Sequence, residues 1–141
     1  MSELSFLSYI VSKINFSIGE DFGTGPIQLE VNINRSLEDK KYLTNENKVS
    51  YTLALSTNIE NENKETGFCA EVVIKGKFQL SFDNQLNNIS NNNLMINNAT
   101  AILFPYLRSA ISSICLTAGI PPFILPIVNV TKDFNDEFSK D

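Results

Sequence analysis

Residues 68–82 have the sequence Phe-Cys-Ala-Glu-Val-Val-Ile-Lys-Gly-Lys-Phe-Gln-Leu-Ser-Phe, and this stretch decides the fold class. Apolar side chains occupy every second position, interrupted only at Gly76, and mostly polar side chains fill the positions between them. A period of two over this length is typical of a β-strand with one buried and one solvent-exposed face. The pattern therefore predicts an antiparallel strand, with a bend or a bulge at Gly76, where the inward side chain is missing.

Two stretches upstream, residues 28–37 and 49–59, repeat this alternation and predict two more strands. A fourth predicted strand, residues 5–18, is apolar on both faces. The two faces consist of Phe6, Ile10, Ile14, Phe16 and Ile18 on one side and of Leu7, Tyr9 and Val11 on the other. Because a strand with two apolar faces needs cover on both, we expect this strand to contact its own chain and another copy of it.

The segments between the predicted strands are polar and predict loops. Residues 60–66 predict a hairpin loop. Residues 38–48 predict a longer loop that contains Tyr42, and residues 19–27 predict a glycine-rich crossing between the first two strands. The glycine spacing of this crossing does not match a nucleotide-binding fingerprint, so no phosphate site is expected there.

The hydrophobic period changes to that of a helix between about Thr100 and Ala118. The apolar positions at helical spacing are Leu103, Leu107, Ala110, Ile111 and Ile114. Asn98 or Thr100 is the expected N-cap and Gly119 the expected end of this helix. Pro105 is expected in the first two turns, where a proline costs least.

Three segments around this helix are predicted to lack regular structure. The asparagine-rich residues 84–98 predict a loop. Residues 119–130 contain three prolines and predict an extended apolar stretch that lies against another surface. Residues 131–141 form a short acidic C-terminal tail with room for one short helical turn at most.

Composition restricts the class of protein. The 141 residues suit a single domain, and 11 basic against 16 acidic residues give a net charge of −5, which argues against a nucleic-acid partner. Histidine is absent from the sequence, which excludes histidine-based catalytic sets and histidine-ligated zinc. No other catalytic or metal-ligating set is recognisable. We therefore expect a protein that is not an enzyme and uses no cofactor.

The sequence also suggests a location. The N-terminal residues lack the basic flank of a signal peptide, and no stretch approaches the roughly 20 apolar residues that span a bilayer. The two cysteines, Cys69 and Cys115, lie far apart in sequence and fit thiols in a reducing compartment. We therefore expect a cytoplasmic protein without direct membrane insertion.

The helix and the stretch after it resemble the SecB family of protein-export chaperones. Residues 102–111, Ile-Leu-Phe-Pro-Tyr-Leu-Arg-Ser-Ala-Ile, carry the sharpest part of the resemblance. Gly-Ile-Pro-Pro at 119–122 and Leu-Pro-Ile-Val-Asn-Val at 125–130 continue it, and the order of strands upstream extends it to about residues 5–130. The resemblance implies an α+β fold: a four-stranded antiparallel sheet with one long helix packed on one face. It also implies a homotetramer built as a dimer of dimers.

The resemblance implies that the protein functions as an ATP-independent holdase. Family members hold unfolded preproteins in apolar grooves and pass them to the translocation ATPase, whereas some relatives serve toxin–antitoxin systems. Family members continue beyond the position of Val130 with a second helix and a flexible tail that contacts the ATPase. Only residues 131–141 follow that position here. We therefore expect unfolded clients as partners and leave contact with the ATPase open. A non-chaperone scaffold that binds one folded partner is the alternative class.

The candidate site residues follow from these expectations. Apolar side chains in irregular segments are the predicted client-binding residues: Phe22, Pro26, Ile27, Tyr42, Phe123, Leu125 and Ile127. The predicted oligomer interface consists of Leu7, Tyr9, Val11, Ser109, Ser112 and Ser113, because small serines permit close helix packing. An acidic docking surface for a basic partner is a further hypothesis, formed by Glu20, Asp21, Glu60, Glu62 and Glu65. The alternative for each apolar residue is packing within its own subunit, and for each acidic residue a solvated loop.

Overall fold

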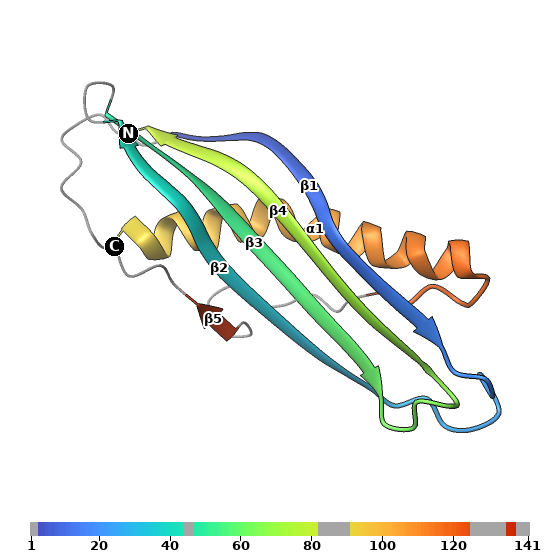
Figure 1. The fold of residues 1–141 in the computed structure, drawn as a ribbon. Helices are drawn as coiled ribbons and strands as arrows, with labels where there is room; N and C mark the ends of the chain where they lie inside the picture. The colour runs from blue at the N-terminus through green and yellow to red at the C-terminus, as the bar shows by residue number, and fades with distance from the viewer. Residues whose placement is uncertain (1–2, 44–46, 82–90, 125–134, 138–141) are drawn as a thin grey trace.

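A computed structural model describes residues 3–43, 47–81, 91–124 and 135–137, and it has one sheet with one long helix across a face (Figure 1). The elements in chain order are β1 (Glu3–Ile18), β2 (Leu29–Leu43), β3 (Lys48–Asn61), β4 (Phe68–Ser81), α1 (Asn91–Ala118) and β5 (Asn135–Glu137). The strand order is β1-β4-β3-β2-β5, and the four long strands pair antiparallel. The expected α+β architecture is therefore confirmed.

The core lies between the helix side of the sheet and α1. β3 and β4 form the centre of the sheet, and their register runs without a break from Lys48 opposite Ser81 to Glu60 opposite Cys69. Alternate residues of both strands are buried against α1, as the period of two predicts. The fully buried side chains include Leu53, Leu55, Ile59, Ile74, Phe78, Leu103, Leu107 and Ile111. Cys115 of α1 belongs to the same cluster.

Gly76 makes room for the helix rather than bending its own strand. The register of β4 with β3 continues through Gly76, so the predicted bulge in β4 is wrong. A Cβ atom on Gly76 would lie 2.8 Å from Cε2 of Phe78 and 3.0 Å from Cδ1 of Leu103. The missing side chain therefore allows α1 to approach the sheet closely at Leu103.

The bulges lie in β1 instead. The register of β1 with β4 shifts between Phe6 and Ser8 and again between Val11 and Lys13. Each bulge moves the residues that follow it to the opposite face of the sheet. Tyr9 and Val11 therefore pair with Gly76 and Ile74 on the helix side, where Phe6 and Phe16 also lie. Ile10 pairs with Lys75 on the outer side, so the predicted division of 5–18 into two faces is wrong.

β2 is longer than predicted. The strand continues to Leu43 and pairs with β3 again from Lys41 opposite Ser50 onward, so the predicted loop 38–48 is wrong for residues 38–43. A register shift between Glu38 and Lys41 interrupts the pairing, and Asp39 within it has a φ of 53°. The alternation of apolar and polar residues is lost at this bulge, although the strand itself continues to Leu43.

α1 starts earlier than its hydrophobic pattern predicts. The helix begins at Asn91, so the predicted cap at Asn98 or Thr100 and the predicted loop are wrong for residues 91–98. Asparagine is a poor helix former, but Met95 and Ile96 are each only 1% exposed. Burial of these two side chains against the sheet therefore stabilises a turn that propensity alone disfavours.

Pro105 lies in the middle of α1, not in its first two turns. A proline has no N–H group to donate to the carbonyl four residues earlier, which here belongs to Ala101. Ala101 is exposed, so water can satisfy that carbonyl. The end of the helix agrees with the prediction: Gly119 has a φ of 82°, and the N–H of Ile120 donates to the carbonyl of Cys115 at 3.1 Å.

One stretch of α1, Met95–Ala118, is long and apolar enough to cross a membrane, judged by length and composition alone. The buried side of the stretch faces the sheet, and the core helix of a globular protein passes the same test.

β5 is a short strand where the sequence predicts a helical turn at most. Its residues Asn135–Glu137 pair parallel with Asn34–Ser36 of β2. That prediction for the C-terminal tail is therefore wrong at these three positions. β5 places part of the tail at the β2 edge of the sheet.

Candidate functional site

The loop between β1 and β2 and the loop between β3 and β4 lie together at one end of the sheet (Figure 1). We call residues 19–28 and 61–67 the crossover tip. Backbone N–H groups of the first loop donate to carbonyls of the second: Gly19 to Gly67 at 2.9 Å, Asp21 to Glu65 at 2.9 Å and Gly23 to Thr66 at 3.0 Å. These bonds fix the crossing on the hairpin.

Asn61 and Thr66 organise the interior of the crossover tip, and both are buried. The N–H of Gln28 donates to Oδ1 of Asn61 at 2.6 Å, and Oγ1 of Thr66 donates to the carbonyl of Pro26 at 3.3 Å. A Cβ atom on Gly67 would overlap the side chain of Asn61, so a glycine is required there. The crossing is therefore a preorganised loop.

Four of the predicted client-binding residues gather at this end. Phe22 is partly buried against the core, whereas Pro26 is exposed and Ile27 is 45% exposed. Phe123 reaches the same end after α1, with its ring centroid 6.3 Å from that of Phe68. The segment before β2 and the segment after α1 thus each place apolar side chains toward this end of the sheet.

The structure does not place the other three predicted client-binding residues at this end. Tyr42 lies near the far end of β2, with the ammonium of Lys40 5.0 Å from its ring centroid. Sequence analysis grouped it with the crossing because the bulge in β2 hid the continuation of the strand. Leu125 and Ile127 lie outside the described residues.

A row of exposed apolar side chains lies on the helix side of β1, and sequence analysis placed only its first member, Tyr9, among the predicted site residues. The row comprises Tyr9, Ile14 and Ile18, and we call it the β1 strip; Ile14 is 52% exposed. Tyr106 of α1 meets one end of the strip, with its ring centroid 4.6 Å from that of Tyr9. The apolar residues on both faces of 5–18 were the signal in the sequence for such a row. The two bulges change which face each later residue occupies, so simple alternation assigned several of them to the wrong face.

Some of the predicted interface residues are exposed, whereas others contact their own chain. Leu7 is 57% exposed, and Ser109 and Ser113 are exposed on α1. Val11 packs partly against the core. Ser112 donates from Oγ to the carbonyl of Phe123 at 3.3 Å, so this side chain ties α1 to the stretch that follows it.

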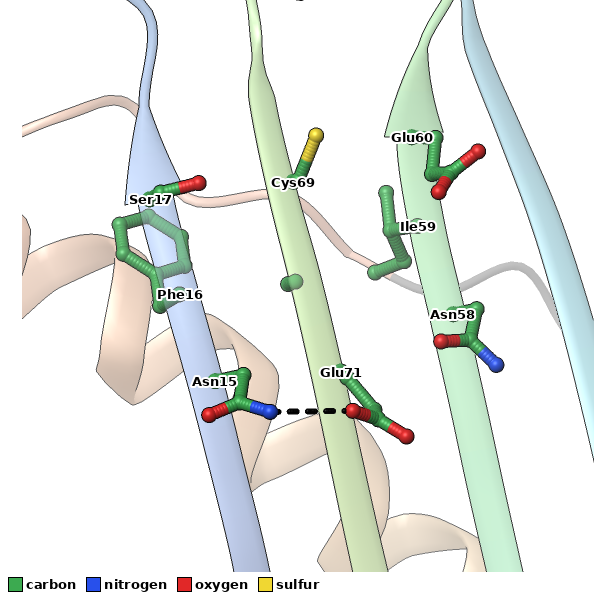
Figure 2. Close-up of a pocket in the computed structure, with 9 residues that line it drawn as sticks. Asn15, Phe16, Ser17, Asn58, Ile59, Glu60, Cys69 and Glu71 are labelled. Atoms are coloured by element: carbon green, nitrogen blue, oxygen red, sulfur yellow. Dashed lines mark hydrogen bonds between the residues drawn. The ribbon is translucent and has the colours of Figure 1, made fainter.

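The outer side of the sheet, opposite α1, carries a shallow polar pocket of about 420 Å³. Figure 2 shows Asn15, Glu71 and Asn58 side by side on three neighbouring strands, with Cys69 and Glu60 above them. Glu71 accepts hydrogen bonds from Lys13 and Asn15, both at 3.1 Å, and these bonds lower its pKa below the ordinary value of 4.5.

No group of three histidine, cysteine, aspartate or glutamate side chains within the described residues could hold a metal ion. The buried Tyr51 donates its hydroxyl to the carbonyl of Met95 at 3.0 Å, and burial raises the pKa of this phenol. The crossover tip and the β1 strip carry exposed apolar side chains that another polypeptide could cover.

A family model described as preprotein translocase subunit SecB matches residues 22–141. The chain belongs to the SecB family. Among curated proteins, it is 29% identical over 91 residues to the protein-export protein SecB of Anaplasma phagocytophilum, covering 64% of this chain and 58% of that protein. It is 32% identical over 129 residues to an uncharacterised protein of Methanocaldococcus jannaschii, covering 90% of this chain and 79% of that one.

Two solved structures have the same SecB-like fold. The SecB-like chaperone Rv1957 of Mycobacterium tuberculosis, in complex with a ChAD peptide from the antitoxin HigA1, matches with a TM-score of 0.67 and 9% identity, covering 89% of this chain and 91% of that chain. A protein of unknown function from Streptococcus agalactiae matches with a TM-score of 0.58 and 16% identity, covering 90% and 99%. At these identities the likeness concerns the fold.

The SecB-like motif of α1 has a structural role in this chain. Phe104 is buried in the core, Pro105 is exposed, and the ring of Tyr106 contacts those of Phe6 and Tyr9 of β1 at a tilt. Consecutive residues of the motif therefore fasten α1 to the sheet core and to β1. The SecB-like motif thus lies where α1 passes over β1, the edge strand of the sheet.

Proposed function

We propose that this SecB-family protein is an ATP-independent holdase that binds unfolded polypeptides in the cytoplasm. The observation that supports this most is the set of apolar side chains on irregular backbone at and near the crossover tip, where Ile27 is 45% exposed and Phe22 and Phe123 are only partly buried. Loops usually present polar side chains to water, so apolar side chains on a fixed loop favour a binding role.

The hydrogen bonds of the crossover tip support this role physically. A loop that is already fixed loses little entropy when a client binds to it. Each apolar side chain that a client covers contributes about 1.5–3 kcal/mol before ordering costs. A few such anchors give reversible binding that tolerates many client sequences, which is what a holdase needs.

The prolines of these segments keep the surface from pairing with other chains. Pro26, Pro121 and Pro122 have no backbone N–H groups, so their segments are poor templates for an added strand. The net charge of −5 per chain adds repulsion between assemblies. Exposed apolar surface is thus compatible with a protein that does not aggregate.

We propose a homotetramer as the working assembly. The β1 strip and the exposed Leu7 offer apolar surface to a second copy. Ser109 and Ser113 form a small-residue face on α1 that permits close approach of another helix. In this assembly the crossover tip stays free for clients.

Two client classes are consistent with the family. One curated relative is a protein-export protein, which supports unfolded preproteins as clients and the translocation ATPase as the partner that receives them. A structural relative holds a peptide of an antitoxin, which supports the alternative of a chaperone dedicated to a toxin–antitoxin system. The genes that neighbour this one distinguish the two.

The test is titration of the protein with fluorescein-labelled, carboxymethylated lysozyme, which stays unfolded without denaturant. The double variant Phe22→Ala with Phe123→Ala is expected to weaken binding at least tenfold, because two anchors are lost. The matched control is Leu43→Ala, an exposed apolar residue at the far end of β2, and it is expected to bind normally. Addition of EDTA or ATP is expected to change nothing.

Binding of lysozyme that is equal in the double variant and the native chain, with assembly preserved, would move the client site away from the crossover tip. Absence of binding by the native chain, together with no suppression of lysozyme aggregation, would instead favour the scaffold alternative. A requirement for ATP or a metal would contradict the holdase mechanism.

A further inference from the structure

The outward edge of β2 is open over most of its length within the described residues. β2 spans Leu29–Leu43, and its outward neighbour β5 pairs only with Asn34–Ser36. On either side of that short pairing, the outward backbone N–H and C=O groups of β2 have no strand beside them in the described part of the chain. Such an edge is a template for an added strand.

This edge is regular, unlike the edge on the other side of the sheet. The register of β2 with β3 is unbroken from Leu29 to Glu38. β1 is interrupted by two bulges, after Phe6 and after Val11. Bulges are a means by which proteins block unwanted strand pairing, so β1 is protected in a way that residues 29–38 are not.

β5 shows that the β2 edge accepts an extended segment, but β5 is poorly suited to stay there. It has three residues, Asn135, Asp136 and Glu137, of types that are depleted in strands. Its pairing with β2 is parallel, which is slightly weaker per residue than antiparallel pairing. A longer segment with better strand formers would therefore displace it.

The side chains of β2 define what such a segment looks like. Leu29, Val31 and Ile33 lie on the helix side, and the first two are only partly buried. Glu30 and Asn32 lie on the outer side and are exposed. A strand added here meets apolar neighbours on one face and polar neighbours on the other, so apolar and polar residues should alternate in it.

We propose that residues 29–38 of β2 bind an extended client segment by strand addition, and that β5 is the internal occupant that this segment displaces. The proposal rests on the proposed chaperone function and adds a second mode of contact to it. Backbone hydrogen bonds at this edge are independent of client sequence, whereas the crossover tip selects apolar side chains. Together they favour segments that are both extended and apolar.

The test uses a fluorescein-labelled peptide of about ten alternating valine and serine residues, the length of the regular stretch. Two further peptides carry N-methyl groups on alternate backbone nitrogens, one on the odd and one on the even residues. At least one of these is expected to bind about tenfold more weakly, because it cannot donate to the edge. A site that recognises side chains alone would bind all three alike.

Two variants of the full chain probe β5. Asp136→Pro puts a proline, which strands accept poorly, in the middle of β5 and is expected to strengthen binding of the unmodified peptide about fivefold, because the internal competitor is weakened. Asp136→Ala, which keeps the backbone N–H, is the matched control and is expected to bind like the native chain. Circular dichroism confirms that both variants are folded.

A photoreactive group on the peptide locates the contact, and cross-links are expected on residues 29–38. Equal binding of all three peptides, or cross-links confined to the crossover tip, would overturn strand addition while leaving the holdase proposal intact. Failure of the native chain to bind unfolded lysozyme would overturn the proposed function itself. Unchanged affinity in folded Asp136→Pro would refute the role of β5.

Discussion

β1 and β2 flank the same two central strands, yet they present different groups to their surroundings. β1 has two bulges and shows the exposed apolar side chains of the β1 strip. β2 is regular up to Glu38 and shows mainly backbone, partly covered by β5. The comparison teaches that one sheet can have an edge adapted to side-chain contact and another adapted to backbone contact.

The largest expected effect concerns assembly through β1. Ile14→Lys places a charge in the proposed interface, where burial without a partner costs several kcal/mol. We expect the assembly to fall apart into smaller species, measured as a lower mass by light scattering at micromolar concentration. Asn32→Lys, the matched change on β2, is expected to leave the mass unchanged. A lower mass for Asn32→Lys and an unchanged mass for Ile14→Lys would place the assembly interface on β2 instead of β1.

A second comparison of the two edges concerns buried charge. Arg35 of β2 is 4% exposed and donates from Nη1 to Oγ1 of Thr100 in α1 at 3.2 Å. Arg35→Met is expected to lower the free energy of unfolding by about 3 kcal/mol, because a buried polar contact between sheet and helix is lost. Lys13→Met on β1 removes an exposed ion pair with Glu71 and is expected to leave the urea midpoint nearly unchanged. Similar midpoints for both variants would contradict this contrast.

The crossover tip joins the two edges, and Asn61 holds it together. Its Nδ2 donates to Oγ1 of Thr66 at 3.2 Å, and its Oδ1 accepts from the N–H of Gln28 at 2.6 Å. Asn61→Ala is expected to destabilise the fold by about 2 kcal/mol and to speed amide exchange in residues 19–28. Asn58→Ala, on the outer side of the same strand, is the control. Unchanged exchange in the crossing would show that Asn61 does not fix it.

The smallest expected effect is a pH dependence at β1. The pKa of Glu71 is lower in the folded chain than its ordinary value of 4.5, chiefly through the hydrogen bond from Lys13. The resulting stabilisation is complete above the ordinary pKa and is lost as the pH falls through the lower, folded pKa. Glu71→Gln should remove this component, so that native and variant chains converge in stability at acid pH. If the difference in stability between the native and Glu71→Gln chains grew as the pH fell, the predicted direction of the pH dependence would be wrong.

Much of the fold follows from the sequence because alternation survives wherever one face is buried. The central strands β3 and β4 are confirmed where their patterns predict them, since both pack against α1 on one side. The SecB-like motif likewise predicts the helix. Local chemistry at Gly119 marks the helix end without reference to the rest of the fold.

The remaining features depend on contacts that no local pattern contains. The bulges of β1 cannot be located from a stretch that is apolar on both faces, because a shift of one residue leaves the pattern equally apolar. The first turns of α1 depend on burial of Met95 and Ile96 against distant strands. The packing of Phe123 on Phe68 depends on the path of the chain after α1, which residue spacing does not reveal.

The two cysteines lie in contrasting environments, and this has a consequence for thiol chemistry. Cys69 is half-buried on the outer side of the sheet, whereas Cys115 is 1% exposed on the sheet-facing side of α1. A thiol reagent therefore modifies Cys69 in the closed protein but reaches Cys115 only while the end of α1 is lifted. The ratio of the two labelling rates, corrected for intrinsic reactivity, measures how often the helix leaves the sheet. The native sequence thus reports its own local opening without an introduced label.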